Sequence, residues 1–181
     1  MIGNDIVDFN LASIQSNWRR KGWLQKICTS SEQSMIHTAQ NPNQMVWKLW
    51  SMKEATYKAH QRRFSVSPKY NPKDFICTND IVTVDNYKYI TSSWITKEYV
   101  HTIATCNYNQ SYVYKILDNS ALKYKSILKD CIADIFEIEE SSIAIEKDRN
   151  HIPVISVNNL LLDTSISLSN HGRFSAFTIN L

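Results

Sequence analysis

The stretch WKLWSMKEATYKAH, residues 47–60, belongs to a chain of 181 residues. Apolar residues recur at helical spacing through this stretch and just before it, which predicts a long helix over residues 44–60. Within that helix Trp50, Glu54 and Lys58 are four residues apart, so an aromatic ring, an acid and a base stack on one face. An acid and a base at this interval form either a surface ion pair, worth about 0.3–0.5 kcal/mol, or part of a site.

The composition is that of an ordinary globular protein. Hydrophobic residues make up 43% of the chain and charged residues 20%, and the net charge is only +3. This mild charge and the absence of any recognition motif argue against a nucleic-acid partner. Without a signal peptide or an apolar run of membrane-spanning length, we expect a cytoplasmic protein that does not bind membranes. Four cysteines without metal-ligand spacing predict free thiols rather than a structural zinc: Cys28, Cys77, Cys106 and Cys131.

The order of predicted elements repeats along the chain. A helix followed by strands occurs first around residues 44–60 and again from a second predicted helix over residues 121–136, an offset of about 75 residues. This order predicts an α+β fold of two pseudo-symmetric halves, residues 1–115 and residues 116–181. Each half would pack a long helix on an antiparallel sheet, and a cleft between the halves would be the natural place for a ligand.

Asp5 lies in an otherwise apolar predicted strand, IGNDIVDF, at the start of the chain. Aspartate is disfavoured in strands, and a buried one needs hydrogen bonds, a charged partner or a metal; capping a neighbouring helix is the simpler alternative. Asp8 faces the opposite side of a regular strand, so we expect it to cap a helix or form an ion pair. Asp5 and Glu54 together would supply two oxygen ligands for Mg²⁺, and Lys58 could then hold a phosphate oxygen.

The segment SLSNHGRF contains a predicted strand that ends in Ser169, Asn170, His171 and Gly172. Hydroxyl and amide groups at a strand end beside a glycine can bind phosphate, although a plain turn has the same composition.

A basic cluster precedes the capping-box signature Thr29-x-x-Glu32, which predicts a short helix. Arg19 and Arg20 stand beside Trp18 and Trp23, and such a group is either solvated charge or a docking patch for a partner.

Three segments together resemble the 4′-phosphopantetheinyl transferase family. IGNDIVD resembles the family's G-x-D-I-V-[DE] strand, WSMKEATYKA its [WF]-x-x-K-E-[AS]-x-x-K-A helix, and ISLSNHGRFSAF its S-x-S-H strand end. The half with the Asp and KEA motifs comes first, as in the short holo-acyl-carrier-protein synthase type, but the segment after Lys58 resembles the two-half type. We therefore expect the family's fold with two halves in swapped order and a cleft built within one chain.

The resemblance implies a Mg²⁺-dependent enzyme that moves 4′-phosphopantetheine from coenzyme A to a serine of an apo acyl or peptidyl carrier protein, releasing 3′,5′-ADP. Asp5 and Glu54 would hold Mg²⁺ on the coenzyme A pyrophosphate. Glu54, directly or through a metal-bound water, would accept the serine proton, and Lys58 would contact the α-phosphate. Coenzyme A would also be bound by the strand end, Ser169, Asn170 and His171.

The family's carrier proteins are acidic, which implies a docking role for the surface near Arg19, Arg20 and Trp23. The chain departs from the family pattern at three places. Asn170 and Ile152 stand where the family has a histidine and the lysine of Gly-Lys-Pro, and Val7 stands where the two-half type adds a second metal carboxylate. The first two changes concern coenzyme A, and their alternative meaning is a degenerate relative that binds coenzyme A or a carrier without catalysis. Lysines that could restore the lost charge are Lys123, Lys125 and Lys129.

Overall fold

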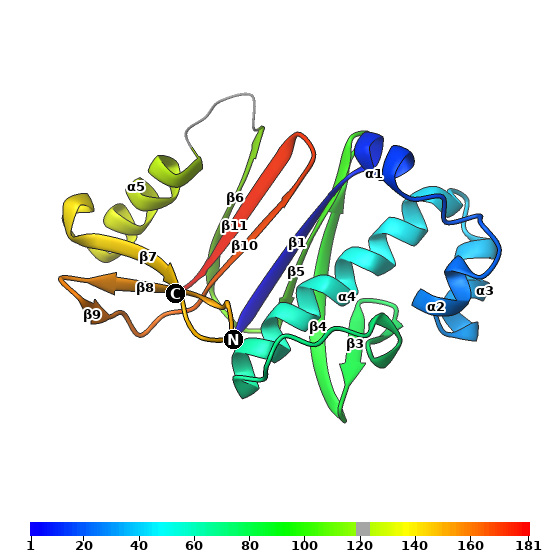
Figure 1. The fold of residues 1–181 in the computed structure, drawn as a ribbon, viewed down its shortest axis with the longest axis horizontal. Coiled ribbons are helices and arrows are strands. Elements are labelled where there is room, and N and C mark those ends of the chain that lie inside the picture. The colour runs from blue at the N-terminus through cyan, green and yellow to red at the C-terminus, as the bar shows by residue number, and fades with distance from the viewer. Residues whose placement is uncertain (119–123) are drawn as a thin grey trace.

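The computed structural model describes residues 1–118 and 124–181, which form three antiparallel sheets with helices packed against them (Figure 1). The elements are, in chain order, β1 (Ile2–Asp8), α1 (Phe9–Gln15), α2 (Trp23–Ile27), α3 (Ser30–Thr38), α4 (Pro42–Phe64), η1 (Pro72–Asp74), β2 (Ile76–Thr78), β3 (Ile81–Val84), β4 (Tyr87–Ile95), β5 (Tyr99–Thr105), β6 (Tyr112–Asp118), α5 (Tyr124–Phe136), η2 (Glu140–Ser142), β7 (Ile143–Lys147), β8 (Pro153–Val157), β9 (Leu160–Leu161), β10 (Ile166–His171) and β11 (Phe174–Asn180). The predicted α+β class is confirmed.

The strands divide into a five-stranded sheet of order β1-β5-β4-β3-β2 and two three-stranded sheets, β10-β11-β6 and β7-β8-β9. Helix α4 lies across the larger sheet, and α5 lies beside the smaller ones (Figure 1). Strands β1 and β10 run side by side at the centre of the molecule, where the Asn4 backbone N–H donates to Ser167 Oγ at 2.8 Å. This contact between β1 and β10 joins the two groups of elements.

Strand β1 packs against α4 with backbone nearly touching backbone. A Cβ atom at Gly3 would lie 2.0 Å from the carbonyl oxygen of Ala55 and 2.6 Å from the amide nitrogen of Ala59. Because strand residues alternate between two faces, Asp5 lies on the same side of β1 as Gly3 and faces the helix. The hydroxyl of Ser51 donates to the carbonyl oxygen of Asp5 at 3.3 Å, which fixes the next turn of α4.

A fully buried ion pair joins α3 to α4. Lys53 Nζ lies 2.9 Å from the Glu32 carboxylate, with both side chains 0% exposed, and it also donates to the carbonyl oxygen of Pro72 at 3.0 Å. Glu32 Oε1 accepts from the amide of Cys77 at 2.7 Å, and Oε2 accepts from the amide of Thr29 to complete the predicted capping box. One acid and one base thus connect α3, α4, η1 and β2.

The second half of the chain has its own apolar core beneath α5. Strand β6 pairs along its whole length with β11. The predicted division between residues 115 and 116 therefore falls inside a strand of the β10-β11-β6 sheet. Residues 121–123, the start of the predicted second helix, lie outside the described residues, as does the predicted charge substitute Lys123. The fully buried side chains of this core include Leu128, Ile132, Ile155, Phe177 and Ile179.

Two chain-wide expectations can be compared with the structure. All four cysteines are free, as their spacing predicts. Within residues 1–118 and 124–181, no helix is both long and apolar enough to cross a membrane.

Replacing Lys53 by methionine is expected to lower the free energy of unfolding by about 3–5 kcal/mol, because it leaves the Glu32 carboxylate buried without its cation. Lys48→Met on the same helix is the matched control. Lys48 pairs with Asp80, whose side chain is 66% exposed, so this loss is expected to cost at most about 1 kcal/mol. Urea denaturation measures both values, and equal stability of the two variants would contradict the structural role of Lys53.

Candidate active site

The two carboxylates singled out in the sequence line one cavity. Asp5 on β1 and Glu54 on α4 face a space of about 310 Å³ together with Asn170 and His171 at the end of β10. One wall of this cavity is apolar and aromatic, formed by Trp23, Trp47 and Trp50. The cavity therefore combines two acids with a hydrophobic wall at the place where β1, α4 and β10 meet.

Asp5 is held by the base of the motif but keeps one oxygen unused. Lys58 Nζ donates to the carbonyl oxygen of Asn4 at 2.9 Å and to Asp5 Oδ1 at 3.3 Å. The other oxygen, Asp5 Oδ2, is buried and has no hydrogen-bond partner within residues 1–118 and 124–181. Burial raises the pKa of Asp5 above its usual value even though the Lys58 ammonium favours the carboxylate.

Glu54 is not half of a surface ion pair. Among the described residues, the ion pair of Lys58 is with Asp5, and none joins it to Glu54. Burial, with a further contribution from the charge of Asp5, raises the pKa of Glu54 to about 7, and Lys58 opposes this shift. A carboxyl group with such a pKa can accept a proton near neutral pH.

The donor set fits Mg²⁺ better than a metal that needs an all-protein cage. The described residues contain no group of three or more His, Cys, Asp or Glu side chains placed to hold a metal ion. Val7, where a further carboxylate was considered, is an apolar part of the cavity wall. Asp5 Oδ2 without a partner and the half-buried Glu54 leave the remaining ligands to water and substrate phosphates, which is the usual arrangement around Mg²⁺.

A second, larger cleft adjoins the carboxylate cavity. It measures about 490 Å³ and lies between the C-terminal half of α4, the loop after β7 and the end of β10. Lys58, Ser169 and Asn170 line this cleft, and Asn170 lines the carboxylate cavity as well. The hydroxyl of Ser169 is buried and has no hydrogen-bond partner in the part of the chain that the structure describes. A ligand with several phosphates could therefore extend from the acids past Lys58 into the cleft.

Asp8 and His171 hold the edge of the site together. Asp8 caps α1, as predicted, through Oδ1, and its Oδ2 accepts from the amide of Arg173 at 2.9 Å. Partial burial alone would raise the pKa of Asp8, but these backbone donors hold it below its usual value. His171 Nδ1 accepts from the Asp8 amide at 2.9 Å, and Nε2 lies 3.2 Å from Gln15 Oε1, so His171 links β10 to β1 and α1. Gly172 has φ +57°, and a Cβ there would lie 2.4 Å from Asp8 Oδ2.

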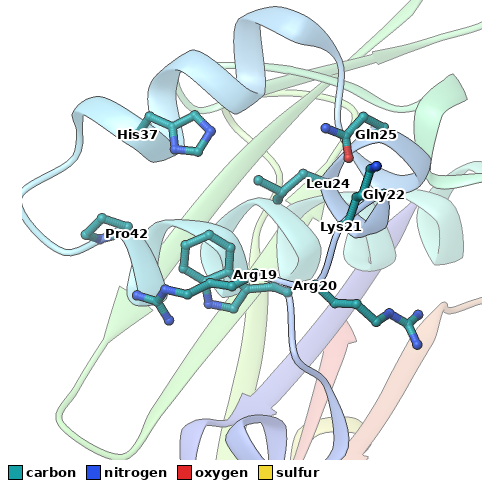
Figure 2. Close-up of a pocket in the computed structure, with 9 residues that line it drawn as sticks. Arg19, Arg20, Lys21, Gly22, Leu24, Gln25, His37 and Pro42 are labelled. Carbon is teal, nitrogen blue, oxygen red and sulfur yellow. The ribbon is translucent and has the colours of Figure 1, made fainter.

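The basic cluster lies on a separate surface beyond the carboxylates. Figure 2 shows Arg19 and Arg20 along one side of a groove of about 520 Å³, with Leu24 in the middle and His37 on the other side. The Arg19 guanidinium lies 4.2 Å from the centre of the Trp18 ring. Trp23, predicted to share this surface, instead lines the carboxylate cavity, so α2 separates the basic groove from the two acids.

Two basic residues of the larger cleft were not predicted to bind coenzyme A, and the pair Arg62-Arg63 has in the sequence the composition of solvated charge or of a docking patch. Arg62 and Lys147 line it together with Lys58, whereas Lys125 and Lys129 are not among the described residues of its wall. Arg62 follows Lys58 by four residues, so the helical spacing that marked Glu54 and Lys58 also reaches Arg62. No sequence signal marked Lys147, because its position depends on how the β7–β8 hairpin packs on α4.

Comparison with known proteins identifies one family. A family model described as ACPS, the 4′-phosphopantetheinyl transferase superfamily, matches residues 1–116, which is more than half of the chain. No curated protein and no solved structure gives a significant match. The matched segment contains Asp5, Glu54 and Lys58 but not the strand end at Asn170.

In metal-free protein, Glu54→Gln is expected to change the pH dependence of stability. The folded-state pKa of Glu54, about 7, lies above its ordinary value of 4.5, so its stabilising contribution is complete below about pH 4.5 and is lost as the pH rises through 7. The variant should therefore gain stability relative to the wild type between about pH 5 and pH 8. Urea denaturation across this range, with the exposed Glu139→Gln as control, measures the difference. A difference that does not vary with pH would contradict the raised pKa.

Proposed function

The chain belongs to the 4′-phosphopantetheinyl transferase superfamily, and we propose that it transfers 4′-phosphopantetheine from coenzyme A to a serine of an apo acyl or peptidyl carrier protein, in the manner of a holo-acyl-carrier-protein synthase. The observation that carries this proposal is the meeting of Asp5, Glu54 and Lys58 where the carboxylate cavity adjoins the larger cleft. The cleft, at about 490 Å³, has the volume of a typical small-molecule site, and the cavity gives a second substrate a place beside the acids.

Each residue of the site has a defined task in this reaction. Asp5 and Glu54 would hold Mg²⁺, which supplies charge stabilisation to the pyrophosphate of coenzyme A when it is bound. Lys58 would contact the α-phosphate and offset the charge that develops on the leaving group. Ser169, Asn170 and His171 would line the coenzyme A site, and Asn170 would offer it a neutral amide donor.

The proposed transfer exchanges one P–O bond for another. Glu54 accepts the proton of the serine hydroxyl, which makes the serine oxygen a better nucleophile. The serine oxygen bonds to the phosphorus that carries pantetheine, and the bond from this phosphorus to the bridging oxygen of the pyrophosphate breaks. The products are the phosphopantetheinyl serine and 3′,5′-ADP. The aromatic wall of Trp23, Trp47 and Trp50 limits access of water, which would otherwise compete with the serine.

The basic groove supports an acidic partner. Arg19, Arg20 and Lys21 are exposed at its edge, and the largely buried Leu24 forms part of its floor (Figure 2). Positive groups around a small apolar patch suit the acidic surface of a carrier protein and would steer it toward the site. We propose that the carrier docks across this groove and α2, so that its serine enters the carboxylate cavity past Trp23.

The reaction is tested by incubating the protein with coenzyme A, Mg²⁺ and several apo carrier proteins, and then measuring the masses of the carriers by mass spectrometry. The expected result is a mass gain of one phosphopantetheine in the wild type and in Glu139→Gln, and no gain in Glu54→Gln. The circular dichroism spectrum should show that the Glu54→Gln variant is folded. Coenzyme A binding without any mass gain would favour the degenerate relative instead, and normal transfer by Glu54→Gln would remove Glu54 from its role.

Reversing the charge of the groove is expected to weaken carrier docking without affecting coenzyme A. The double variant Arg19→Glu/Arg20→Glu should raise the KM for the carrier about tenfold or more and leave the KM for coenzyme A unchanged. The variant Lys69→Glu/Lys88→Glu changes the net charge equally at exposed positions away from the groove. Steady-state kinetics compares the two, and the same effect in both would assign the loss to overall charge rather than to docking.

A further inference from the structure

The face of α4 that carries the candidate catalytic residues continues for another turn. Glu54, Lys58 and Arg62 follow one another at intervals of four residues, and each interval advances about 6 Å along a helix. Glu54 lies in the carboxylate cavity, whereas Lys58 and Arg62 both line the larger cleft. The helix therefore offers an acid and then two bases in a row, with Arg62 about 12 Å beyond Glu54 along the helix axis.

Arg62 is a half-buried cation with donors to spare. Its Nη2 donates a long hydrogen bond, 3.4 Å, to the carbonyl oxygen of Pro153, and its buried Nε has no hydrogen-bond partner among the described residues. Burial lowers the pKa of Arg62 to about 10, although Asp148 opposes the shift. The Asp148 carboxylate already accepts from the amides of Asn150 and Ile152 at 2.8 and 2.9 Å. A guanidinium in this state is stabilised by an anion that enters the cleft.

The opposite wall of the cleft supplies less positive charge than the family resemblance implies. Ile152 takes the place of the expected lysine and is buried at 7% exposure, so it offers no charge to a ligand. The hairpin that carries it is fastened to the end of α4, since Gln61 Nε2 donates to the carbonyl oxygen of Asn150 at 3.0 Å and Asn150 Nδ2 donates to that of Ser65 at 2.9 Å. Arg62 and the exposed Lys147 line the cleft together with Ile152 and its neighbour His151.

We propose that Arg62, assisted by Lys147, binds the 3′-phosphate of coenzyme A and so makes the chain select coenzyme A over donors that lack this phosphate. The inference rests on the proposed function. A nucleotide whose 5′-pyrophosphate contacts Lys58 carries its 3′-phosphate on the adjoining ribose, within reach of the next turn of α4. A base on the helix thus supplies positive charge that Ile152 does not.

The test compares coenzyme A with 3′-dephospho-coenzyme A as donors for a carrier protein. The wild type should prefer coenzyme A in kcat/KM, and Arg62→Gln should reduce this preference about ten- to a hundredfold, as expected for a lost charge-assisted contact. Arg62→Lys should retain part of it. Arg63→Gln is the matched control, because Arg63 is exposed and packs on the Phe64 and Tyr87 rings. The preference is a ratio measured on one sample, so a smaller folded fraction of a variant does not alter it.

A binding experiment keeps the inference separate from the proposed reaction. Isothermal titration calorimetry with adenosine 3′,5′-bisphosphate and with adenosine 5′-monophosphate should show tighter binding of the bisphosphate by the wild type and Arg63→Gln but not by Arg62→Gln. If no carrier is modified but this pattern holds, the proposed function fails and the role of Arg62 stands. An Arg62→Gln variant that keeps the wild-type preference for the 3′-phosphate, in transfer or in binding, would overturn the inference.

Discussion

The backbone of β1 touches the backbone of α4 at Gly3, and the position of the candidate site follows from this contact. Any side chain at Gly3 would overlap the carbonyl oxygen of Ala55, and larger residues than Ala55 or Ala59 would hold the helix away. Because Asp5 is two residues from Gly3, its side chain faces the same helix, α4, which carries Glu54. A strand aspartate and a helix glutamate can share one cavity only at this short distance between the two elements.

Two basic residues of α4 show how similar charges acquire different functions. Lys53 is fully buried, and its pairing with Glu32 and backbone carbonyl groups compensates its charge, so it stabilises the fold. Lys58 is partly exposed and balances Asp5, while Glu54 nearby has no cation of its own. The first arrangement is electrostatically complete. In the second, burial raises the pKa values of both acids, and the charge of Asp5 adds to the shift at Glu54. A site that carries uncompensated charge is one that a metal ion and a substrate can complete.

Contacts between residues close in the sequence were predictable, whereas contacts between residues far apart in the sequence were not. The capping box of Thr29 and Glu32 and the helix cap of Asp8 were predictable, because partners two or three residues apart meet through backbone geometry alone. The second function of Glu32, as the buried partner of Lys53, was not predictable, because 21 residues separate them. The contacts of the His171 ring nitrogens with Asp8 and Gln15 were likewise not predictable, because these partners are 163 and 156 residues away.

The sequence by itself determined the α+β class, the long helix, the acids and bases spaced along it, and the family motifs in residues 1–116. It could not determine where each of these residues points. Helical periodicity gives the angle between two side chains around the helix axis, but it does not say which face of the helix packs against the rest of the protein. Only the tertiary structure decided that Lys53 enters the core, that Glu54 and Asp5 share a cavity, and that Arg62 lines the cleft. The physical reason is that burial is set by the surfaces packed against α4, and those come from strands at both ends of the chain.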